Sequence, residues 1–253
     1  SANTISAAEH AFGLMLATAR NIPQGNESLK NGKWERSNLM GSELYGKTLG
    51  LVGLGRIGAE VAKRALAFEM QVLAHDPFVS DDRAKTLGVE LVSIEDLFSK
   101  SDFISLHTAL VEQTKGIVNK QLLANSKENL IIINAARGPL INSKDLIDAI
   151  KSNKLKGAAI DVFDQEPAVD DPLTKVDQIV VTPHLGASTS EAQDRAAIVV
   201  AEEVSSILSG GAARYATNLP MMNEEDLAFT GEYAGAAMLA ASVANQISEG
   251  VVK

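Results

Sequence analysis

The glycine-rich segment at residues 53–58, which reads GLGRIG, constrains the fold more than any other part of the chain. An apolar run ends in it, and a helical pattern over 56–68 begins in it. In the G-x-G-x-x-G spacing, Gly53 permits a tight turn, Gly55 lets a pyrophosphate approach the backbone, and Gly58 lets helix and strand pack closely. The helix start adds free N–H groups and the positive end of its dipole. The segment therefore predicts a phosphate-binding loop between a strand and a helix.

Short apolar runs and helical patterns alternate from Lys47 onward. We expect strands at 48–55, 70–76, 102–108, 129–136, 156–163 and 178–184, and helices at 56–68, 94–100, 119–124 and 143–152. Strands of nearly continuous apolar character, most of them separated by a helix, indicate a parallel sheet that is covered on both faces. Right-handed crossovers then predict an α/β fold with a doubly wound, Rossmann-like parallel sheet.

Four segments fall outside this alternation. Residues 1–20 form a helical pattern that is apolar on most of its surface and needs covering on several sides. Residues 21–37 form a polar arm that holds the single tryptophan, Trp34. A long amphipathic helix is expected at 189–210, and an Ala-rich helical stretch follows Pro220.

The composition excludes several classes of function. A net charge of −9 without an offsetting basic face disfavours nucleic acid and anionic membranes as partners. The chain has no cysteine, hence no disulfide framework, no thiolate chemistry and no Cys-type zinc site, and we expect no metal ion. No apolar run reaches the length of a membrane span, and Glu9 and His10 interrupt the only segment that resembles a signal peptide. We therefore expect a cytoplasmic protein.

Asp76 stands at the end of the second expected strand. A carboxylate at this position accepts hydrogen bonds from the adenine-ribose hydroxyls of a dinucleotide. Its charge repels a 2′-phosphate, and no arginine stands immediately beside it in the run HDPFVSDDR. Asp76 therefore favours NAD over NADP as the cofactor. The alternative is a turn aspartate that caps the backbone before Pro77.

Polar residues also follow the later strands. NAARGPL contains Arg137, AAIDVFDQEP contains Asp161 and Glu166, and TPHLG contains His184. Taken singly, each has an ordinary explanation as a loop charge, a turn or capping carboxylate, or a loop histidine bonded to the backbone. In an open α/β sheet, however, the C-terminal strand ends form the crevice in which ligands bind. We therefore expect these groups to converge.

Together, these side chains match a pair of 2-hydroxy acid and 2-oxo acid. An imidazole gives or takes the carbinol proton while a hydride moves to or from nicotinamide. A carboxylate such as Glu166 fixes the tautomer of His184, and the guanidinium of Arg137 binds a substrate carboxylate through two hydrogen bonds. Asp161 is then expected on the nicotinamide side of the cofactor. We expect His10 to serve a packing contact between domains or subunits rather than catalysis.

The motifs GLGRIG, HDP, NAARGPLI, GAAIDVFDQEP and TPHLGAST, in this order, resemble the D-isomer-specific 2-hydroxyacid dehydrogenase family. The resemblance implies that Arg137 orients the substrate and that Glu166 pairs with His184, the proton donor or acceptor. It implies NAD contacts at Gly53, Gly55, Arg56, Ile57, Gly58, Asp76, Thr108, Ala135, Ala136, Arg137, Asp161, His184, Gly186 and Ala187. It also implies a homodimer or homotetramer that is built partly from the arm near Trp34.

The resemblance sets the expected domain organisation as well. Residues 1–187 are expected to form the NAD-binding domain, including the leading helix and the arm. Residues 188–217 are expected to be the returning helix of an incomplete, flavodoxin-like substrate domain, and 218–253 the start of a further C-terminal domain. The family's substrate-binding segment is expected upstream of Ser1. Two departures from the family wording, HTALVEQT at 107–114 and Pro139, leave the three catalytic candidates untouched.

The function implied is an NAD-dependent oxidoreductase for a 2-hydroxy acid, with 3-phospho-D-glycerate in L-serine biosynthesis as the expected substrate. The alternatives are a glyoxylate or hydroxypyruvate reductase, a fragment that binds NAD without turnover, and a corepressor-like NAD-sensing module. A formate dehydrogenase is disfavoured, because that relative lacks the glutamate partner of the histidine and Glu166 is present.

Overall fold

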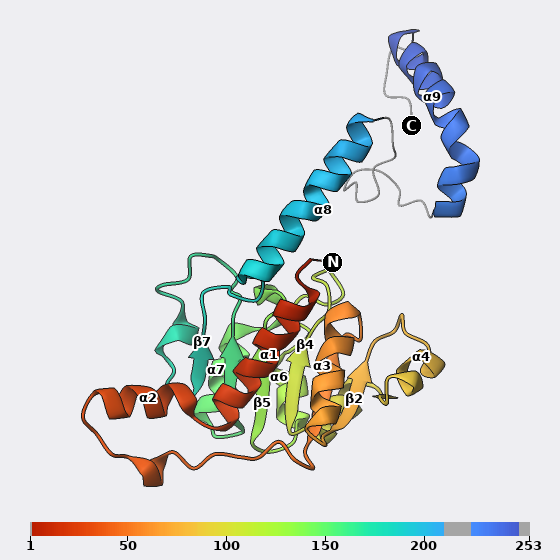
Figure 1. Cartoon of the computed structure of the whole chain (residues 1–253). Helices are drawn as coiled ribbons and strands as arrows, with labels where there is room; N and C mark the ends of the chain where they lie inside the picture. The colour runs from red at the N-terminus through yellow and green to blue at the C-terminus, as the bar shows by residue number, and fades with distance from the viewer. Residues whose placement is uncertain (1, 210–223, 248–253) are drawn as a thin grey trace. The chain divides into compact units, whose positions relative to one another are not determined.

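Seven strands form one parallel sheet in the computed structural model, which describes residues 2–209 and 224–247 (Figure 1). The strands are β1 (Thr48–Val52), β2 (Gln71–His75), β3 (Glu90–Leu91), β4 (Phe103–Leu106), β5 (Leu130–Asn134), β6 (Leu155–Ile160) and β7 (Ile179–Val181). Their spatial order is β3-β2-β1-β4-β5-β6-β7, so the order reverses between β1 and β4. This order confirms the predicted doubly wound sheet, in which ligands bind beyond the C-terminal strand ends at the point of reversal.

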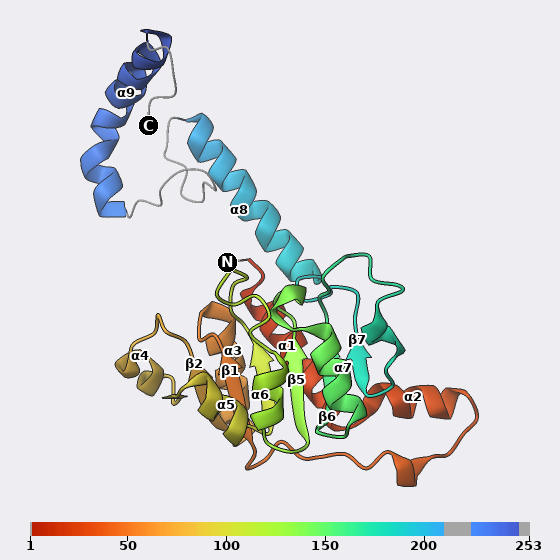
Figure 2. The ribbon, with the colours of Figure 1, turned by 180° about the vertical axis from the view of Figure 1, so that it is seen from behind.

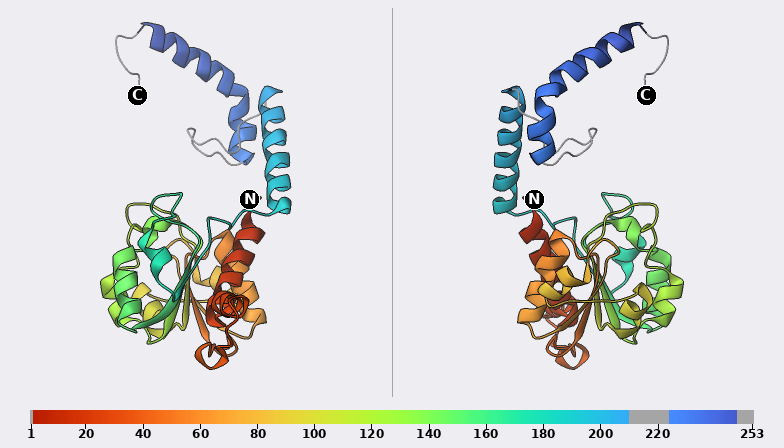
Figure 3. Two further views of the ribbon diagram at one scale, coloured as in Figure 1. Left: turned by 90° about the vertical axis from the view of Figure 1, so that its left-hand side faces the viewer. Right: turned by 90° about the vertical axis from the view of Figure 1, so that its right-hand side faces the viewer.

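Helices cover both faces of the sheet (Figures 2 and 3). One layer holds α1 (Thr4–Ala19) and α3 (Arg56–Ala67), and the other holds α5 (Ile94–Lys100), α6 (Lys120–Asn125) and α7 (Ser143–Lys151). Each layer has its own apolar core. In β5, Ile131 and Ile133 belong to the core under α1 and α3, whereas Leu130 and Ile132 belong to the opposite core. Successive side chains of a strand point to opposite faces, which is why this strand is apolar throughout.

The leading apolar helix, α1, packs against α3 and against β5, β6 and β7. This packing accounts for its apolar surface, because residues such as Ala8 and Met15 are buried. The arm that follows contains α2 (Ile22–Lys30) and the short 3-10 helix η1 (Arg36–Asn38), neither of which has a buried residue. Trp34 lies between them and is 81% exposed.

Several strands end earlier than the apolar pattern predicts. The strand expected at 156–163 ends at Ile160, although Asp161 and Val162 are also buried. After Ile160 the chain leaves the strand but stays inside the molecule. Burial therefore extends two residues beyond the strand. Six short elements were not predicted from the sequence: α2 and η1 in the arm, α4 (Asp81–Thr86), β3, and the 3-10 helices η2 (Gly138–Leu140) and η3 (Pro172–Lys175).

The chain divides into two compact units, Ser1–Gln193 and Asp194–Lys253. The long helix α8 (Ser190–Leu208) begins in the first unit, and α9 (Glu224–Ile247) belongs to the second. The predicted boundary at 217/218 and the predicted helix end at Gly210 lie outside the described residues, so the three-part domain organisation stays a prediction. None of the helices in 2–209 and 224–247 combines the length and apolar character that crossing a membrane requires.

Candidate functional site

The three glycines of the loop after β1 differ in what surrounds them. Gly53 has a φ of +98°, and a Cβ there would lie 2.8 Å from the backbone of His107 and Thr108. A Cβ at Gly58 would overlap the carbonyl oxygen of Gly53. A Cβ at Gly55, in contrast, would meet no protein atom within 4 Å. Gly53 and Gly58 therefore serve the fold, whereas the space above Gly55 is open to a ligand.

Asp76 lies beside this loop at the end of β2. Its Oδ2 accepts a hydrogen bond of 2.8 Å from the backbone N–H of Leu54, and its Oδ1 accepts one of 2.9 Å from that of Phe78. The carboxylate thus joins the glycine loop to the turn after β2. Each oxygen has a second lone pair, which is available to a hydroxyl donor of a ligand.

The residues that follow β4, His107 and Thr108, pack against the glycine loop. His107 packs its backbone against Gly53, and its Nε2 lies 2.9 Å from Ser105 Oγ. Burial lowers the pKa of His107 to about 4, so the ring is neutral near pH 7. Thr108, one of the residues expected to contact NAD, follows directly and adjoins Gly53 through its backbone N.

Arg137 lies in a turn that a buried asparagine holds in place. The side chain of Asn134, which is 1% exposed, donates a 2.9 Å hydrogen bond to the carbonyl of Arg137 and accepts one of 3.1 Å from the N–H of Ala136. The Arg137 side chain is exposed, with Nη1 2.6 Å from the Ala136 carbonyl. Asn134 was not among the residues predicted from the sequence, although its position at the end of an apolar run is a signal of such a role.

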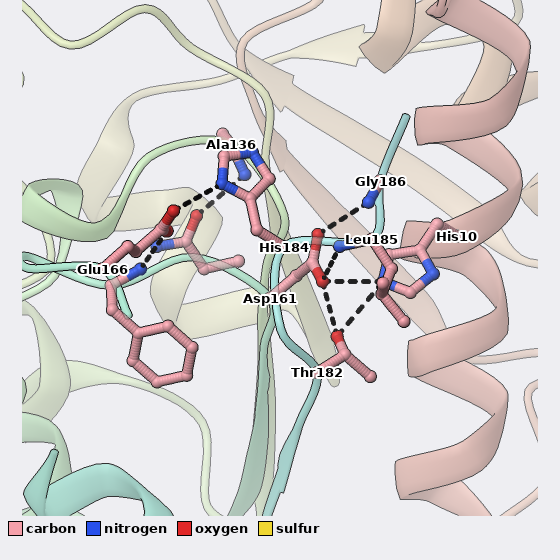
Figure 4. A network of polar contacts seen from close by, with 10 residues as sticks. His10, Ala136, Asp161, Glu166, Thr182, His184, Leu185 and Gly186 are labelled. Atoms are coloured by element: carbon pink, nitrogen blue, oxygen red, sulfur yellow. Dashed lines mark hydrogen bonds and ion pairs between the residues drawn. The ribbon is translucent and has the colours of Figure 1, made fainter. Parts of the chain in front are cut away.

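His184 and Glu166 face each other, as Figure 4 shows, with His184 Nδ1 2.8 Å from Glu166 Oε2. Glu166 Oε1 also accepts a 3.1 Å hydrogen bond from the N–H of Phe163. The hydrogen bond from His184, and then the one from Phe163, lowers the pKa of Glu166. An ionised carboxylate only accepts, so Nδ1 carries the proton and Nε2 is left for a substrate. The side chains are 50% and 38% exposed, which leaves them accessible.

Asp161 organises the loop that carries His184. Its carboxylate is fully buried. Oδ1 accepts hydrogen bonds from Thr182 Oγ1 at 2.6 Å and Leu185 N at 2.7 Å, and Oδ2 accepts one from Gly186 N at 2.9 Å. Burial alone would raise the pKa of Asp161, but the hydrogen bonds, including one from His10, lower it overall. Both oxygens are engaged within the protein, so a direct contact with nicotinamide stays a prediction.

The structure brings the predicted residues to one edge of the sheet in two groups. The glycine loop, Asp76 and Thr108 adjoin at the ends of β1, β2 and β4. The other candidates follow β5, β6 and β7, whose last residues pair as Asn134 with Ile160 and Ile160 with Val181. Arg56 is exposed at the start of α3, Ile57 is half-buried, and Gly186 is buried beside Asp161. No cluster of three or more potential metal ligands occurs among the described residues.

These features fit a dinucleotide. The backbone above Gly55 is open, an acidic side chain follows β2, and the first turn of α3 presents free N–H groups to a phosphate. The fold and the site together define a dinucleotide-binding domain with a histidine–glutamate pair at its strand ends.

Residues 12–186 match the NAD-binding domain of the D-isomer specific 2-hydroxyacid dehydrogenases, and the chain belongs to this family. It is 46% identical to D-3-phosphoglycerate dehydrogenase of Methanocaldococcus jannaschii over 252 residues, which are 99% of this chain and 48% of that protein. It is 49% identical to D-3-phosphoglycerate dehydrogenase of Mycobacterium tuberculosis over 225 residues, 88% of this chain and 43% of that protein. The chain therefore spans less than half the length of these relatives.

A solved structure has the same fold. The TT0316 protein from Thermus thermophilus superimposes with a TM-score of 0.78 at 36% identity, covering 84% of this chain and 68% of that one.

Proposed function

We propose that this chain is the NAD-binding part of an oxidoreductase that transfers a hydride between nicotinamide and a 2-hydroxy acid. The reaction we propose is the interconversion of 3-phospho-D-glycerate and 3-phosphohydroxypyruvate in L-serine biosynthesis. The observation that carries the proposal is the His184–Glu166 pair, with Nδ1 and Oε2 2.8 Å apart at the carboxyl edge of the sheet. The relatives named D-3-phosphoglycerate dehydrogenase support the choice of substrate.

When bound, NAD would supply the acceptor for the hydride that leaves the carbon bearing the substrate hydroxyl. His184 Nε2 takes the hydroxyl proton as general base and returns it in the reverse direction. Glu166 holds the ring and balances the charge that the imidazole gains. The exposed guanidinium of Arg137 binds the substrate carboxylate and orients the neighbouring carbon.

We propose that the cofactor lies along the strand ends. Gly53, Gly55, Arg56, Ile57 and Gly58 are assigned to the pyrophosphate, and the charge of Asp76 excludes the 2′-phosphate of NADP. The remaining contacts proposed are Thr108, Ala135, Ala136, Arg137, Asp161, His184, Gly186 and Ala187. The exposed Trp34 supports a homodimer or homotetramer formed through the arm. A cytoplasmic location stays a prediction.

The test begins with calorimetric titration of the chain with NADH and then NADPH, followed by turnover of 3-phosphohydroxypyruvate, hydroxypyruvate and glyoxylate. We expect saturable NADH binding, weak NADPH binding and the highest kcat/KM for 3-phosphohydroxypyruvate. NADH binding without turnover of any of the three would support the alternative of a non-catalytic NAD-binding part. No binding of either nucleotide would refute the proposal.

His184→Ala tests the role of the histidine. We expect turnover to be lost, because no other described group replaces the proton acceptor, while the affinity for NADH changes by less than about threefold. Glu166→Gln is the matched variant, since it keeps the size of the partner and removes its charge. A normal rate in His184→Ala would refute the assignment.

A further inference from the structure

The otherwise apolar helix α1 carries two polar side chains that reach the loop around His184. Ser6 and His10 are one helical turn apart and therefore lie on the same face. Ser6 Oγ is 2.9 Å from Thr189 Oγ1, and His10 Nε2 is 3.2 Å from Thr182 Oγ1. Thr182 and Thr189 stand at the two ends of the loop that contains His184. The two side chains thus hold both ends of this loop.

His10 also contacts the buried carboxylate of Asp161, which accepts hydrogen bonds from the loop. Its Nε2 lies 3.0 Å from Asp161 Oδ1, and a dashed line marks this contact in Figure 4. Thr182 donates its only hydroxyl proton to the same oxygen at 2.6 Å, and Asp161, when ionised, only accepts. Neither neighbour has a proton to give to His10. The proton must therefore reside on Nε2 of His10, which makes His10 a donor to this network.

The loop needs such support because its backbone is strained. His184 has a φ of +57°, in the left-handed region that a residue with a side chain rarely adopts. Its N–H donates to the carbonyls of Asp161 at 2.9 Å and Thr182 at 3.0 Å. Its side chain is half exposed, and its only hydrogen-bond partner among the described residues is Glu166. The direction of the ring therefore depends on the backbone, which the groups around Asp161 hold in place.

We propose that His10 is a positioning residue for His184, and that together with Ser6 it forms a clamp from α1 onto residues 182–189. The clamp holds the His184 ring where Glu166 can keep its Nδ1 proton and where Nε2 faces the substrate. Its importance for turnover rests on the proposed function of His184. Its effect on the conformation of His184 does not, and can be measured separately.

The experiment uses two variants of His10. His10→Leu removes the hydrogen-bond donor and replaces the imidazole with an apolar side chain of similar size. His10→Gln instead places an amide N–H near the position of Nε2. The readout is the set of imidazole ¹⁵N and ¹H signals, which four histidines make tractable. The matched control is Glu9→Gln, the neighbouring residue on α1, whose side chain bonds Arg64 instead of the loop. NADH affinity, kcat and KM are measured for all four proteins.

We expect wild type to show His10 with its proton on Nε2 and His184 with a hydrogen-bonded Nδ1–H. In His10→Leu the His184 Nδ1–H signal should shift or broaden, and kcat should fall about tenfold, with KM and NADH affinity within about twofold. His10→Gln should restore both the signal and most of kcat, and Glu9→Gln should change neither. A purely structural role would lower thermal stability but leave the His184 signals in place.

Two results would overturn the clamp: unchanged His184 signals in His10→Leu, or signals in His10→Gln as altered as those in His10→Leu. Both are read without turnover. If wild type binds NADH but reduces no 2-oxo acid, the proposed reaction fails, and the imidazole signals alone still decide whether the clamp exists.

Discussion

A methyl group added at Gly55 should separate cofactor binding from folding. In Gly55→Ala the new Cβ meets no protein atom within 4 Å, so the free energy of unfolding should change by no more than about 0.5 kcal/mol. The same methyl occupies the space through which a pyrophosphate reaches the backbone, so NADH affinity should fall at least tenfold, or about 1.4 kcal/mol.

Gly58→Ala is the matched variant, because the chemical change is identical and the surroundings differ. Its Cβ would overlap the Gly53 carbonyl, so α3 has to move away from the loop. Overpacking of this kind costs about 1–3 kcal/mol. For both variants, urea unfolding monitored by circular dichroism measures the change in the free energy of unfolding. Calorimetric titration measures the change in NADH affinity. If Gly55→Ala binds NADH as tightly as wild type, the open space is not the pyrophosphate path and the assignment of the loop is wrong.

Two further predictions concern His107 and Asp76. The pKa of His107 is lowered from 6.5 to about 4. Between pH 6.5 and about 4, the unfolded chain therefore takes up a proton at this residue and the folded chain does not. His107 therefore costs no stability above pH 6.5, and the cost grows as the pH falls to about 4, reaching about 3 kcal/mol. His107→Gln, which keeps a polar group near Ser105, should remove this part of the pH dependence in urea unfolding; an identical profile would contradict the cause. Asp76→Asn keeps an oxygen for the N–H of Leu54 but loses the charge, so the preference for NADH over NADPH should fall roughly tenfold. An unchanged ratio of the two dissociation constants would show that another group selects the cofactor.

Much of the fold followed from local patterns. The apolar runs and the helices between them predicted the parallel sheet, and the helix expected at 94–100 is α5 with the same bounds. The residues after each run predicted which side chains would meet, because parallel strands all end at one edge of the sheet. The hydrogen bond between His184 and Glu166, 18 residues apart, joins two residues that the sequence analysis singled out.

Other features depend on contacts between distant segments. The sequence placed His10 at a packing contact, yet it lies 3.0 Å from Asp161, 151 positions further along the chain. Asp161 is predicted to contact the cofactor, and the structure adds that its buried carboxylate accepts hydrogen bonds from the backbone of the loop after β7. The contacts of His10 arise only when α1 packs across β6 and β7.

The sequence by itself predicted the alternation of the main strands and helices and the glycine loop, because these depend on residue types at short spacing, and it indicated that His184 and Glu166 would meet, because both follow strands of a parallel sheet. The tertiary structure decided which glycine is open to a ligand and which group holds the loop of His184. Gly55 and Gly58 are the same residue type in the sequence. Only the atoms packed around each of them determine whether an added Cβ meets open space or the backbone.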